Sequence, residues 1–291
     1  MKMRSFLGGM RFSVLLLVIG LVSLTALTIF WIRVDGANKE DTAISDFQPG
    51  QDDFDHTFSR YQMLVNTVVV PVSPLGAGVH YKRAKELRKD REEIRANLER
   101  VSRAQFDSWS NNQQLAFLIN AYNFMTIELV IKHYPVRSIK DIGTFFVGPW
   151  KQKFFTLFGD VRDLDFIEHG LIREMFLEPR IHFALVCASR GCPSLQKEVY
   201  VAEKLDEQLD FATRQFLQDK AHNRIDHEGK KLFLSKIFSW YEDDFLLFSD
   251  SLQEFALRYM GDNSLKSPGA AALNYRVVYS EYDWALNDVQ Q

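Results

Sequence analysis

The chain has 291 residues, of which 46% are hydrophobic and 25% are charged, so it has enough apolar material for a buried core. Its 15 glycines and 8 prolines are too few for a fibrous or disordered protein. The net charge of −3 hides an asymmetry, because residues 1–33 hold four basic side chains and no acid. The rest of the chain therefore has 35 − 4 = 31 basic and 38 acidic side chains. Such an acidic body argues against a nucleic-acid partner, since phosphate binding needs a positive surface.

The uncharged stretch Phe12–Ile32 is predicted to span a membrane. Its 21 residues would form a helix of about 31 Å, close to the thickness of a bilayer core of about 30 Å. Basic residues before it favour a cytoplasmic N-terminus. A signal peptide has a shorter apolar run and a small-x-small cleavage site, which "VDGA" matches poorly. We expect residues 1–33 to be a single-pass membrane anchor, with the body on the extracytoplasmic (periplasmic) side. A cleaved signal is the alternative.

Residues 34–56 are polar and acidic, which is typical of a linker, and residues 57–291 are expected to form one globular domain. The β-branched run at 66–72 predicts a short strand, which Pro71 would confine to an edge. Apolar residues at helical spacing within the charged segment 81–101 predict a surface helix.

The strongest predicted helix begins with a capping box formed by Ser110 and Gln113, and it extends to about His133. This segment is apolar on nearly every side, which is typical of a buried helix. Asn120 and Asn123 lie three residues apart on it and are therefore neighbours on the helix surface.

A second helix is predicted from Asp163, and its apolar neighbours turn Glu168 toward the interior. The run "IHFALV" at 181–186 predicts a buried strand that ends at Cys187. Further elements are predicted later in the chain: a strand at 231–235 and helical segments at 201–219 and 236–248. The expected fold class is α+β, a helix-rich single domain with a small β-sheet, preceded by one transmembrane helix.

Five blocks in this order resemble a family found in bacteria and plants, the domain of unknown function number 547. They are "LAFLINAYN" (115–123), "LDFIEHGLIR" (164–173), "IHFALVCASRGCPSL" (181–195), "LSKIFSWYEDDF" (234–245) and "YDWALN" (282–287). The resemblance covers about residues 80–288. This chain has Val186 where the family commonly has asparagine, and Leu118 where it often has tryptophan. Because the family implies no reaction, function has to be argued from the site.

Both cysteines of the chain, Cys187 and Cys192, lie in the third block. In an oxidising compartment they would form a disulfide, which stabilises little when it closes so short a loop. A second interpretation is two buried cysteines that act as small hydrophobic side chains. The third interpretation is a nucleophile at Cys187, since a thiolate is nucleophilic when its surroundings support it.

A nucleophile at Cys187 needs supporting groups, and Arg190 in the following turn is one candidate. His182 and His169 are the candidate bases. A straight strand would place His182 and Cys187 on opposite faces, so the strand would have to bulge or end early for them to meet.

Asn120 or Asn123 could orient a histidine or donate to an oxyanion, but buried amides that tie loops together are the favoured interpretation. An inward Glu168 needs a partner, and we expect Arg173 or Arg180 to supply it rather than a catalytic-acid role.

The terminal block "YDWALN" is interpreted as a docking tail. In it Asp283 is expected to be a cap or a buried acceptor, and Trp284 a plug in the core. The functional alternative is that Asp283 completes a Cys-His-Asp set.

No metal site or cofactor is expected. His182, Cys187, Cys192 and Glu168 are permissible zinc ligands, but their spacings match no paired-cysteine zinc pattern. The sequence contains no Walker loop, no dinucleotide fingerprint, no nucleophile elbow and no zincin motif.

Two functional hypotheses remain open. The first is a membrane-anchored, extracytoplasmic, thiol-dependent hydrolase or acyltransferase that acts on peptide or amide-like substrates. In it Cys187 is the nucleophile, His182 or His169 the base, and Asn120 a polariser. The second is a non-enzymatic binding or assembly module with a Cys187–Cys192 disulfide. Its partner would be a small molecule, a peptide or a protein that the sequence does not identify.

Overall fold

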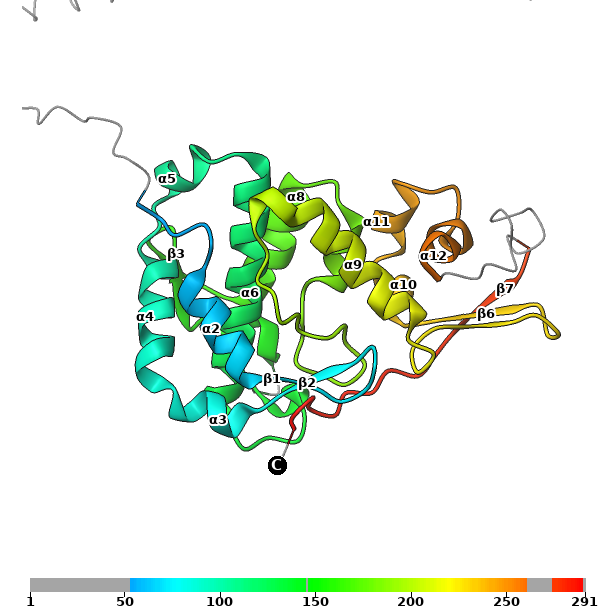
Figure 1. Ribbon diagram of the computed structural model, residues 1–291, viewed down its shortest axis with the longest axis horizontal. Helices are drawn as coiled ribbons and strands as arrows, with labels where there is room; N and C mark the ends of the chain where they lie inside the picture. The colour runs from blue at the N-terminus through cyan, green and yellow to red at the C-terminus, as the bar shows by residue number, and fades with distance from the viewer. Residues whose placement is uncertain (1–52, 145, 261–273, 290–291) are drawn as a thin grey trace, which may run out of the picture. The chain divides into compact units, whose positions relative to one another are not determined.

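A computed structural model describes residues 53–144, 146–260 and 274–289 of the protein (Figure 1). Helices dominate these residues, and short strands form two hairpins and one three-stranded sheet. The predicted helix-rich α+β fold is therefore confirmed. The predicted membrane span, Phe12–Ile32, lies outside the described residues.

Helix α6, Asn111–His133, is the most deeply buried element of the described chain. Its predicted capping box is confirmed: Ser110 Oγ accepts the N–H of Gln113 at 3.3 Å, and Gln113 Oε1 accepts the N–H of Ser110 at 3.0 Å. Of the described helices, only α6 is long and apolar enough to cross a membrane, and its apolar stretch is wholly buried within the body. Burial on every side agrees with its lack of a polar face.

The part of the chain before α6 forms short helices and one hairpin. The helix predicted at 81–101 is present as two helices that are separated at Leu87. The strand predicted at 66–72 is shorter than expected, because residues 66–68 belong to the preceding helix. The hairpin is antiparallel, with Val69 opposite Val79. These elements are α2 (Ser59–Val68), β1 (Val69–Pro71), β2 (Ala77–Val79), α3 (Tyr81–Glu86), α4 (Arg88–Glu99) and α5 (Arg103–Asp107).

The helix predicted from Asp163 is present, and it contains a wide turn. Asp163 Oδ1 caps it by accepting the N–H of Phe166 at 2.9 Å. The chain passes from α7 (Leu164–Ile167) through a π-helical turn, η3 (Glu168–Ile172), into α8 (Arg173–Met175). Glu168 is buried, as predicted. Two 3-10 helices and a hairpin precede α7 in the chain: η1 (Ile139–Asp141), η2 (Pro149–Lys151), β3 (Phe155–Leu157) and β4 (Asp160–Arg162).

The strand predicted at 181–186 is wrong. Pro179–Phe183 form a 3-10 helix, η4, and the chain then turns into the cysteine segment. The Asn123 side chain binds both sides of this turn, donating to Ala184 O at 2.9 Å and accepting from Val186 N at 2.8 Å. A side chain thus supplies the partners that a neighbouring strand would have provided, and a short apolar run does not distinguish the two cases. Strand alternation therefore does not separate His182 from Cys187.

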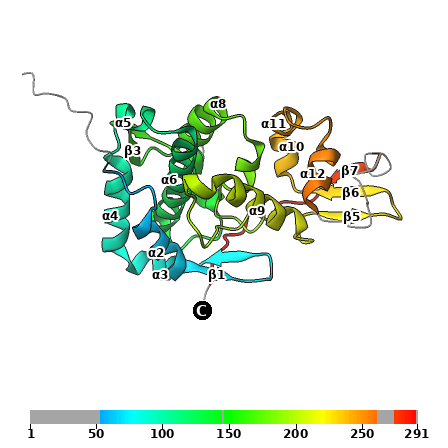
Figure 2. The same ribbon diagram turned by 45° about the horizontal axis from the view of Figure 1, so that its top comes forward.

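The end of the body remote from α4 holds a second helical group and the three-stranded sheet (Figures 1 and 2). In that sheet β6 pairs antiparallel with β5 and parallel with β7. The predicted strand at 231–235 and helix at 201–219 are present, whereas the helix predicted at 236–248 is broken at Tyr241. The elements are η5 (Ala202–Lys204), α9 (Leu205–Gln218), β5 (Arg224–Asp226), β6 (Lys231–Leu234), α10 (Ile237–Trp240), α11 (Glu242–Leu246), α12 (Leu252–Met260) and β7 (Arg276–Tyr279).

After β7 the C-terminal tail runs back along the body to the β1–β2 hairpin, as the red trace in Figure 1 shows. On its way it binds the cysteine segment: Gly191 N donates to Asp283 O and Arg190 N to Ala285 O, each at 2.8 Å. Gly191 permits this approach, because a Cβ atom there would lie 3.0 Å from both the backbone nitrogen of Asp283 and the Tyr282 ring.

Candidate active site

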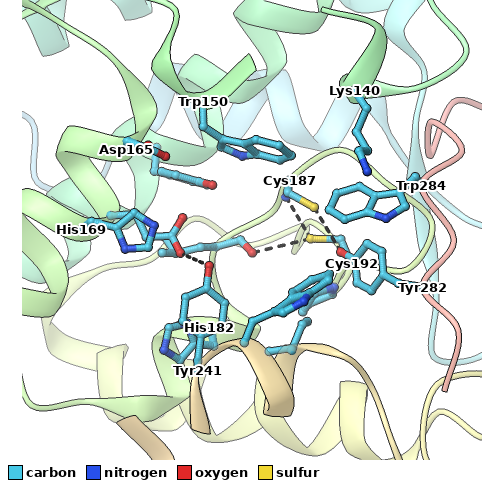
Figure 3. A pocket seen from close by; sticks show the side chains of 16 residues that line it. Lys140, Trp150, Asp165, His169, His182, Cys187, Cys192, Tyr241, Tyr282 and Trp284 are labelled. Atoms are coloured by element: carbon cyan, nitrogen blue, oxygen red, sulfur yellow. Dashed lines mark hydrogen bonds between the residues drawn. The ribbon is translucent and has the colours of Figure 1, made fainter. Parts of the chain in front are cut away.

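A cavity of about 440 Å³ lies where three segments of the chain meet (Figure 3). The π-helical turn contributes Glu168 and His169, the cysteine segment contributes Cys187 and Cys192, and the C-terminal tail contributes Tyr282. Three tryptophans complete much of its wall: Trp150, Trp240 and Trp284. Both cysteines and both candidate histidines thus line one cavity.

Cys187 is half-buried, and hydroxyl groups surround its sulfur. Its Sγ lies 3.1 Å from Ser189 Oγ and 3.2 Å from the Tyr282 hydroxyl, and its backbone N–H donates to Cys192 Sγ at 2.9 Å. Figure 3 shows the two cysteines side by side with Tyr282 next to them. Both thiols are free, and Cys192 is the more deeply buried of the two.

A tight turn of the backbone brings Cys192 back to Cys187. Ala188 adopts a left-handed conformation with φ of 63°, which is uncommon for a residue with a side chain. The N–H of Cys192 then donates to Ser189 O at 3.2 Å, and the N–H of Asn287 in the tail donates to Ala188 O at 3.0 Å. The tail therefore holds the turn in the shape that places the two sulfurs together.

These contacts favour the thiolate form of Cys187. A side-chain hydrogen bond from Cys192 is the largest influence, and together with bonds from Ser189 and Tyr282 it outweighs burial and lowers the pKa of Cys187 to about 7. Burial, followed by the hydrogen bond and charge of Cys187, raises the pKa of Cys192 well above its ordinary value. Cys192 therefore stays protonated. Its S–H donates to Leu185 O at 3.8 Å and can rotate toward a thiolate at Cys187, and a hydrogen bond to a charged form lowers that group's pKa.

His182 is buried and forms its hydrogen bond with Asp244 rather than with Cys187. Its Nε2 lies 2.7 Å from Asp244 Oδ2, and its ring stacks on Tyr241 with centroids 3.8 Å apart. Burial lowers the pKa of His182 despite the opposing influence of Asp244, so the ring is neutral at pH 7 and Nε2–H is the donor.

His169 is exposed, and its Nδ1 lies 3.0 Å from Arg173 Nη1. Because a guanidinium only donates, Nδ1 of His169 accepts. The hydrogen-bond partners of the Cys187 sulfur are thus two hydroxyls and a thiol, whereas each candidate base is bonded to another residue.

Asp244 joins His182 to Arg173. The Arg173 guanidinium binds it through Nε–Oδ2 at 2.7 Å and Nη2–Oδ1 at 2.8 Å. Burial acts to raise the pKa of Asp244, but the hydrogen bonds from His182 and Arg173 outweigh it and the pKa is lowered. Asp244 is therefore ionised at neutral pH.

Glu168 has a different partner from the expected Arg173 or Arg180. The Tyr241 hydroxyl donates to Glu168 Oε1 at 2.5 Å, while Arg173 binds Asp244 and Arg180 binds Glu178. Tyr241 lies at the break between α10 and α11, which places its ring between His182 and the cavity-lining carboxylate. Charge repulsion by Glu168 adds to burial in raising the pKa of Tyr241, so the phenol stays protonated and donates.

The two asparagines on α6 hold loops. Asn120 donates to Tyr200 O at 2.7 Å and accepts from Tyr200 N at 3.0 Å, and Asn123 binds the turn before Cys187 in the same manner. Neither lines the cavity. This arrangement matches the favoured interpretation of buried amides that tie loops together.

Arg190 and Asp283 are exposed and line a neighbouring groove instead of the cavity. Asp283 Oδ1 accepts the N–H of Ala285 at 2.8 Å, so it caps a turn of the tail. Trp284 is half-buried at the cavity wall and is not the core plug that was expected. The acid that pairs with the candidate base His182 is Asp244. Asp244, Ser189, Tyr241 and Tyr282 were not identified as site residues from the sequence.

Within residues 53–144, 146–260 and 274–289, no group of three or more histidine, cysteine, aspartate or glutamate side chains is arranged to hold a metal ion. The fold and site therefore define a helix-rich α+β protein with a thiol facing an aromatic cavity.

Residues 106–217 match the model of a family described as "Protein of unknown function, DUF547". This confirms the resemblance to that family over a segment that contains α6, η3 and both cysteines. Asp244 and Tyr282 lie beyond the matched residues. No curated protein and no solved structure matches the chain.

Proposed function

We propose that the protein is a thiol-dependent hydrolase or acyltransferase whose nucleophile is Cys187. One observation carries this proposal: a half-buried thiol faces a cavity among three side chains that hydrogen-bond to its sulfur. A cysteine with a lowered pKa is partly ionised at neutral pH and needs no imidazole in direct contact to become nucleophilic.

In the proposed reaction the Cys187 thiolate attacks the carbonyl carbon of an ester, thioester or amide, and a carbonyl electron pair moves to oxygen. The hydroxyls of Ser189 and Tyr282, which already lie beside the sulfur, can donate to that oxyanion. The intermediate then collapses, the leaving group departs with a proton taken from water, and an acyl-thioester remains on Cys187. Attack by water or by an acceptor amine restores the thiolate.

The carboxylate of the cavity suits the second half of this reaction. Glu168 lines the same cavity as Cys187 and can take a proton from the attacking water or amine, whereas Nδ1 of His169 already accepts from Arg173. His182 is assigned a positioning role, because it bonds to Asp244 and stacks on Tyr241, which in turn holds Glu168.

The aromatic wall supports a substrate with an apolar or planar body. Trp284 and Tyr282 have ring centroids 4.5 Å apart, and Trp240 and Tyr282 have centroids 4.8 Å apart. Such surfaces bury a flat or apolar acyl group favourably. Lys140 lies 4.5 Å from the Trp284 ring centre at the same cavity, where it can bind an anionic end of a substrate.

The test is to trap the acyl-enzyme. The full-length chain in detergent is treated with a p-nitrophenyl ester, and intact mass and peptide mapping locate the acyl group. We expect an acyl group on Cys187 in the wild type and none in Cys187→Ser. In Cys192→Ser the acyl group should still be on Cys187 but should form more slowly, because the thiolate loses its Cys192 partner. Release of free acid beyond one equivalent would show turnover.

Equal acylation of Cys187→Ser would refute the nucleophile. Acylation at Cys187 that never turns over with esters, thioesters or amides would instead support the binding-module alternative.

We also propose that the body is held on the extracytoplasmic side of a membrane by Phe12–Ile32. The uncharged length of that segment and the basic residues before it support this topology.

A further inference from the structure

We infer that Cys187 and Cys192 form a redox-active pair that carries out thiol–disulfide exchange with a disulfide small enough to enter the cavity. In this activity Cys187 attacks the substrate disulfide, and Cys192 resolves the mixed disulfide. The inference uses the same thiol as the proposed function but does not depend on acyl transfer.

The first support is the contact between the two cysteines. The Cys187 N–H donates to Cys192 Sγ at 2.9 Å, which holds the Cys192 sulfur against the backbone of Cys187. The left-handed Ala188 closes the turn between them. A disulfide requires Cβ atoms about 3.5–4.5 Å apart. The Cys192 sulfur already lies against the backbone of Cys187, and Figure 3 shows the two side chains next to each other.

The second support is the unequal exposure of the two sulfurs. Both cysteines line the cavity, but Cys187 is half-buried whereas Cys192 is only 7% exposed. An incoming disulfide therefore meets Cys187 first. Cys192 is less accessible to reagents in solution, yet it lies next to Cys187 (Figure 3).

The third support is the order in which the two thiols ionise. Cys187 has the lowered pKa, and part of the raised pKa of Cys192 comes from the hydrogen bond and charge of Cys187. That charge disappears when Cys187 enters a mixed disulfide, which makes Cys192 easier to deprotonate at the moment when it has to attack.

The exchange balances without a further reagent. The Cys187 thiolate attacks one sulfur of R–S–S–R′, the S–S bond breaks, and R′–S⁻ leaves. This thiolate takes the proton of Cys192, whose sulfur then attacks the sulfur of Cys187 and displaces R–S⁻, which is protonated by water. The two protein thiols are oxidised to one disulfide, and the substrate disulfide is reduced to two thiols.

The test uses 2-hydroxyethyl disulfide as the probe and the reduced full-length chain in detergent. Intact mass should show that the wild type loses two hydrogens and keeps no adduct, while both halves of the probe appear as free thiol. Cys192→Ser should accumulate a stable mixed disulfide on Cys187, and Cys187→Ser should form neither product. A wild type that accumulates the mixed disulfide as Cys192→Ser does, or that fails to react, would overturn the inference.

Two further measurements keep the result interpretable. Equilibration of the wild type alone in dithiothreitol buffers of graded redox poise should convert the free pair to an intramolecular disulfide, independently of whether any variant folds. Ester acylation of Cys192→Ser separates the two ideas. If the ester acylates Cys187 but the wild type does not exchange with the disulfide probe, only the redox pair is refuted. If the wild type exchanges with the probe but the ester does not acylate Cys187, only the proposed function is refuted.

Discussion

At the scale of single residues, hydrogen bonds and burial act on the Cys187 sulfur in opposite directions. Burial disfavours a thiolate, whereas the donors at Cys192, Ser189 and Tyr282 favour it, and the donors prevail. The Ser189 hydroxyl donates its one proton to the Tyr282 hydroxyl at 3.0 Å, so the Tyr282 proton is free to point at the sulfur and Ser189 supports the thiolate through its backbone N–H. The reactivity of Cys187 therefore depends on a tyrosine from the far end of the chain.

Tyr282→Phe tests this dependence, because it keeps the ring and removes only the hydroxyl. The pKa of Cys187 should rise, and its alkylation by iodoacetamide at pH 7 should slow by roughly threefold to tenfold, since a hydrogen bond to a charged group contributes about 1.5 kcal/mol or more. Tyr279→Phe, at the end of β7 and outside the cavity wall, is the matched control. An unchanged rate for Tyr282→Phe would show that its hydroxyl does not support the thiolate.

The pair formed by buried His182 and half-buried Asp244 makes stability depend on pH. The folded-state pKa of Asp244 is lowered, so its contribution is complete above the unfolded value of about 4 and is lost as pH falls below it. His182 also has a lowered folded-state pKa, so below about 6.5 the unfolded chain gains a proton that the folded chain resists. Both effects reduce stability as the solution is acidified.

Asp244→Asn should lower the free energy of unfolding at pH 7 by about 2 kcal/mol, because it leaves Arg173 and His182 without their anionic partner. It should also flatten the loss of stability below pH 4. Denaturant unfolding measured between pH 3 and pH 8 checks both effects, with the exposed Asp243→Asn as control. If the free energy of unfolding falls with the same slope below pH 4 in Asp244→Asn and in the wild type, Asp244 is not the group responsible for the loss of stability in acid.

At the scale of elements, the site exists because three irregular segments are fixed against regular ones. Helix α6 holds the turn before Cys187 through Asn123, and the tail holds the turn after it through Gly191 and Arg190. The π-helical turn presents Glu168 to the cavity from the other side. The cysteine segment thus needs neither a strand nor a long helix to keep its shape.

Gly191→Ala should loosen the tail, since the added Cβ would meet the Asp283 nitrogen and the Tyr282 ring at 3.0 Å. We expect a loss of about 1–3 kcal/mol in unfolding free energy and slower alkylation of Cys187, because Tyr282 is displaced. Gly148→Ala is the control: nothing lies within 4 Å of a Cβ there, so a change within about 0.5 kcal/mol is expected. Equal stability for the two variants would contradict the close approach.

The regular elements could be predicted from sequence, but the irregular ones could not. The capping box at Ser110 and the cap at Asp163 are local signals, so the sequence predicts where α6 and α7 begin. The turn at 181–186 depends on Asn123, which is some sixty residues away in the chain. The break at Tyr241 likewise follows from packing against His182 and not from a local breaker.

At the scale of the whole molecule, the cavity lies where two apolar clusters of the described body meet. Ile181 belongs to the cluster around α6, and Phe183 belongs to the cluster around α11 and α12. His182 lies between them and faces the cavity. The sequence predicts Cys187, His182 and Glu168 as members of one site. Asp244 is 62 residues from its partner His182, and Tyr282 is 95 residues from its partner Cys187, so no local sequence pattern predicts either contact.

The proposed topology predicts that the full chain stays with membranes after carbonate extraction, and that deletion of residues 1–33 releases it. Protease added outside intact cells with a permeable outer envelope should digest the body. A mature N-terminus near residue 37 would instead show that the segment is cleaved as a signal peptide.

The central claim is that Cys187 is a thiolate stabilised by its neighbours, and the pH dependence of its alkylation tests this most directly. Iodoacetamide labelling of Cys187 in the full-length chain, followed by mass spectrometry, should have a midpoint near pH 7. In Cys192→Ala the midpoint should move up toward about 8.5, the value of an unsupported cysteine. A wild-type midpoint at about 8.5 or above, or one that Cys192→Ala leaves unchanged, would contradict the account.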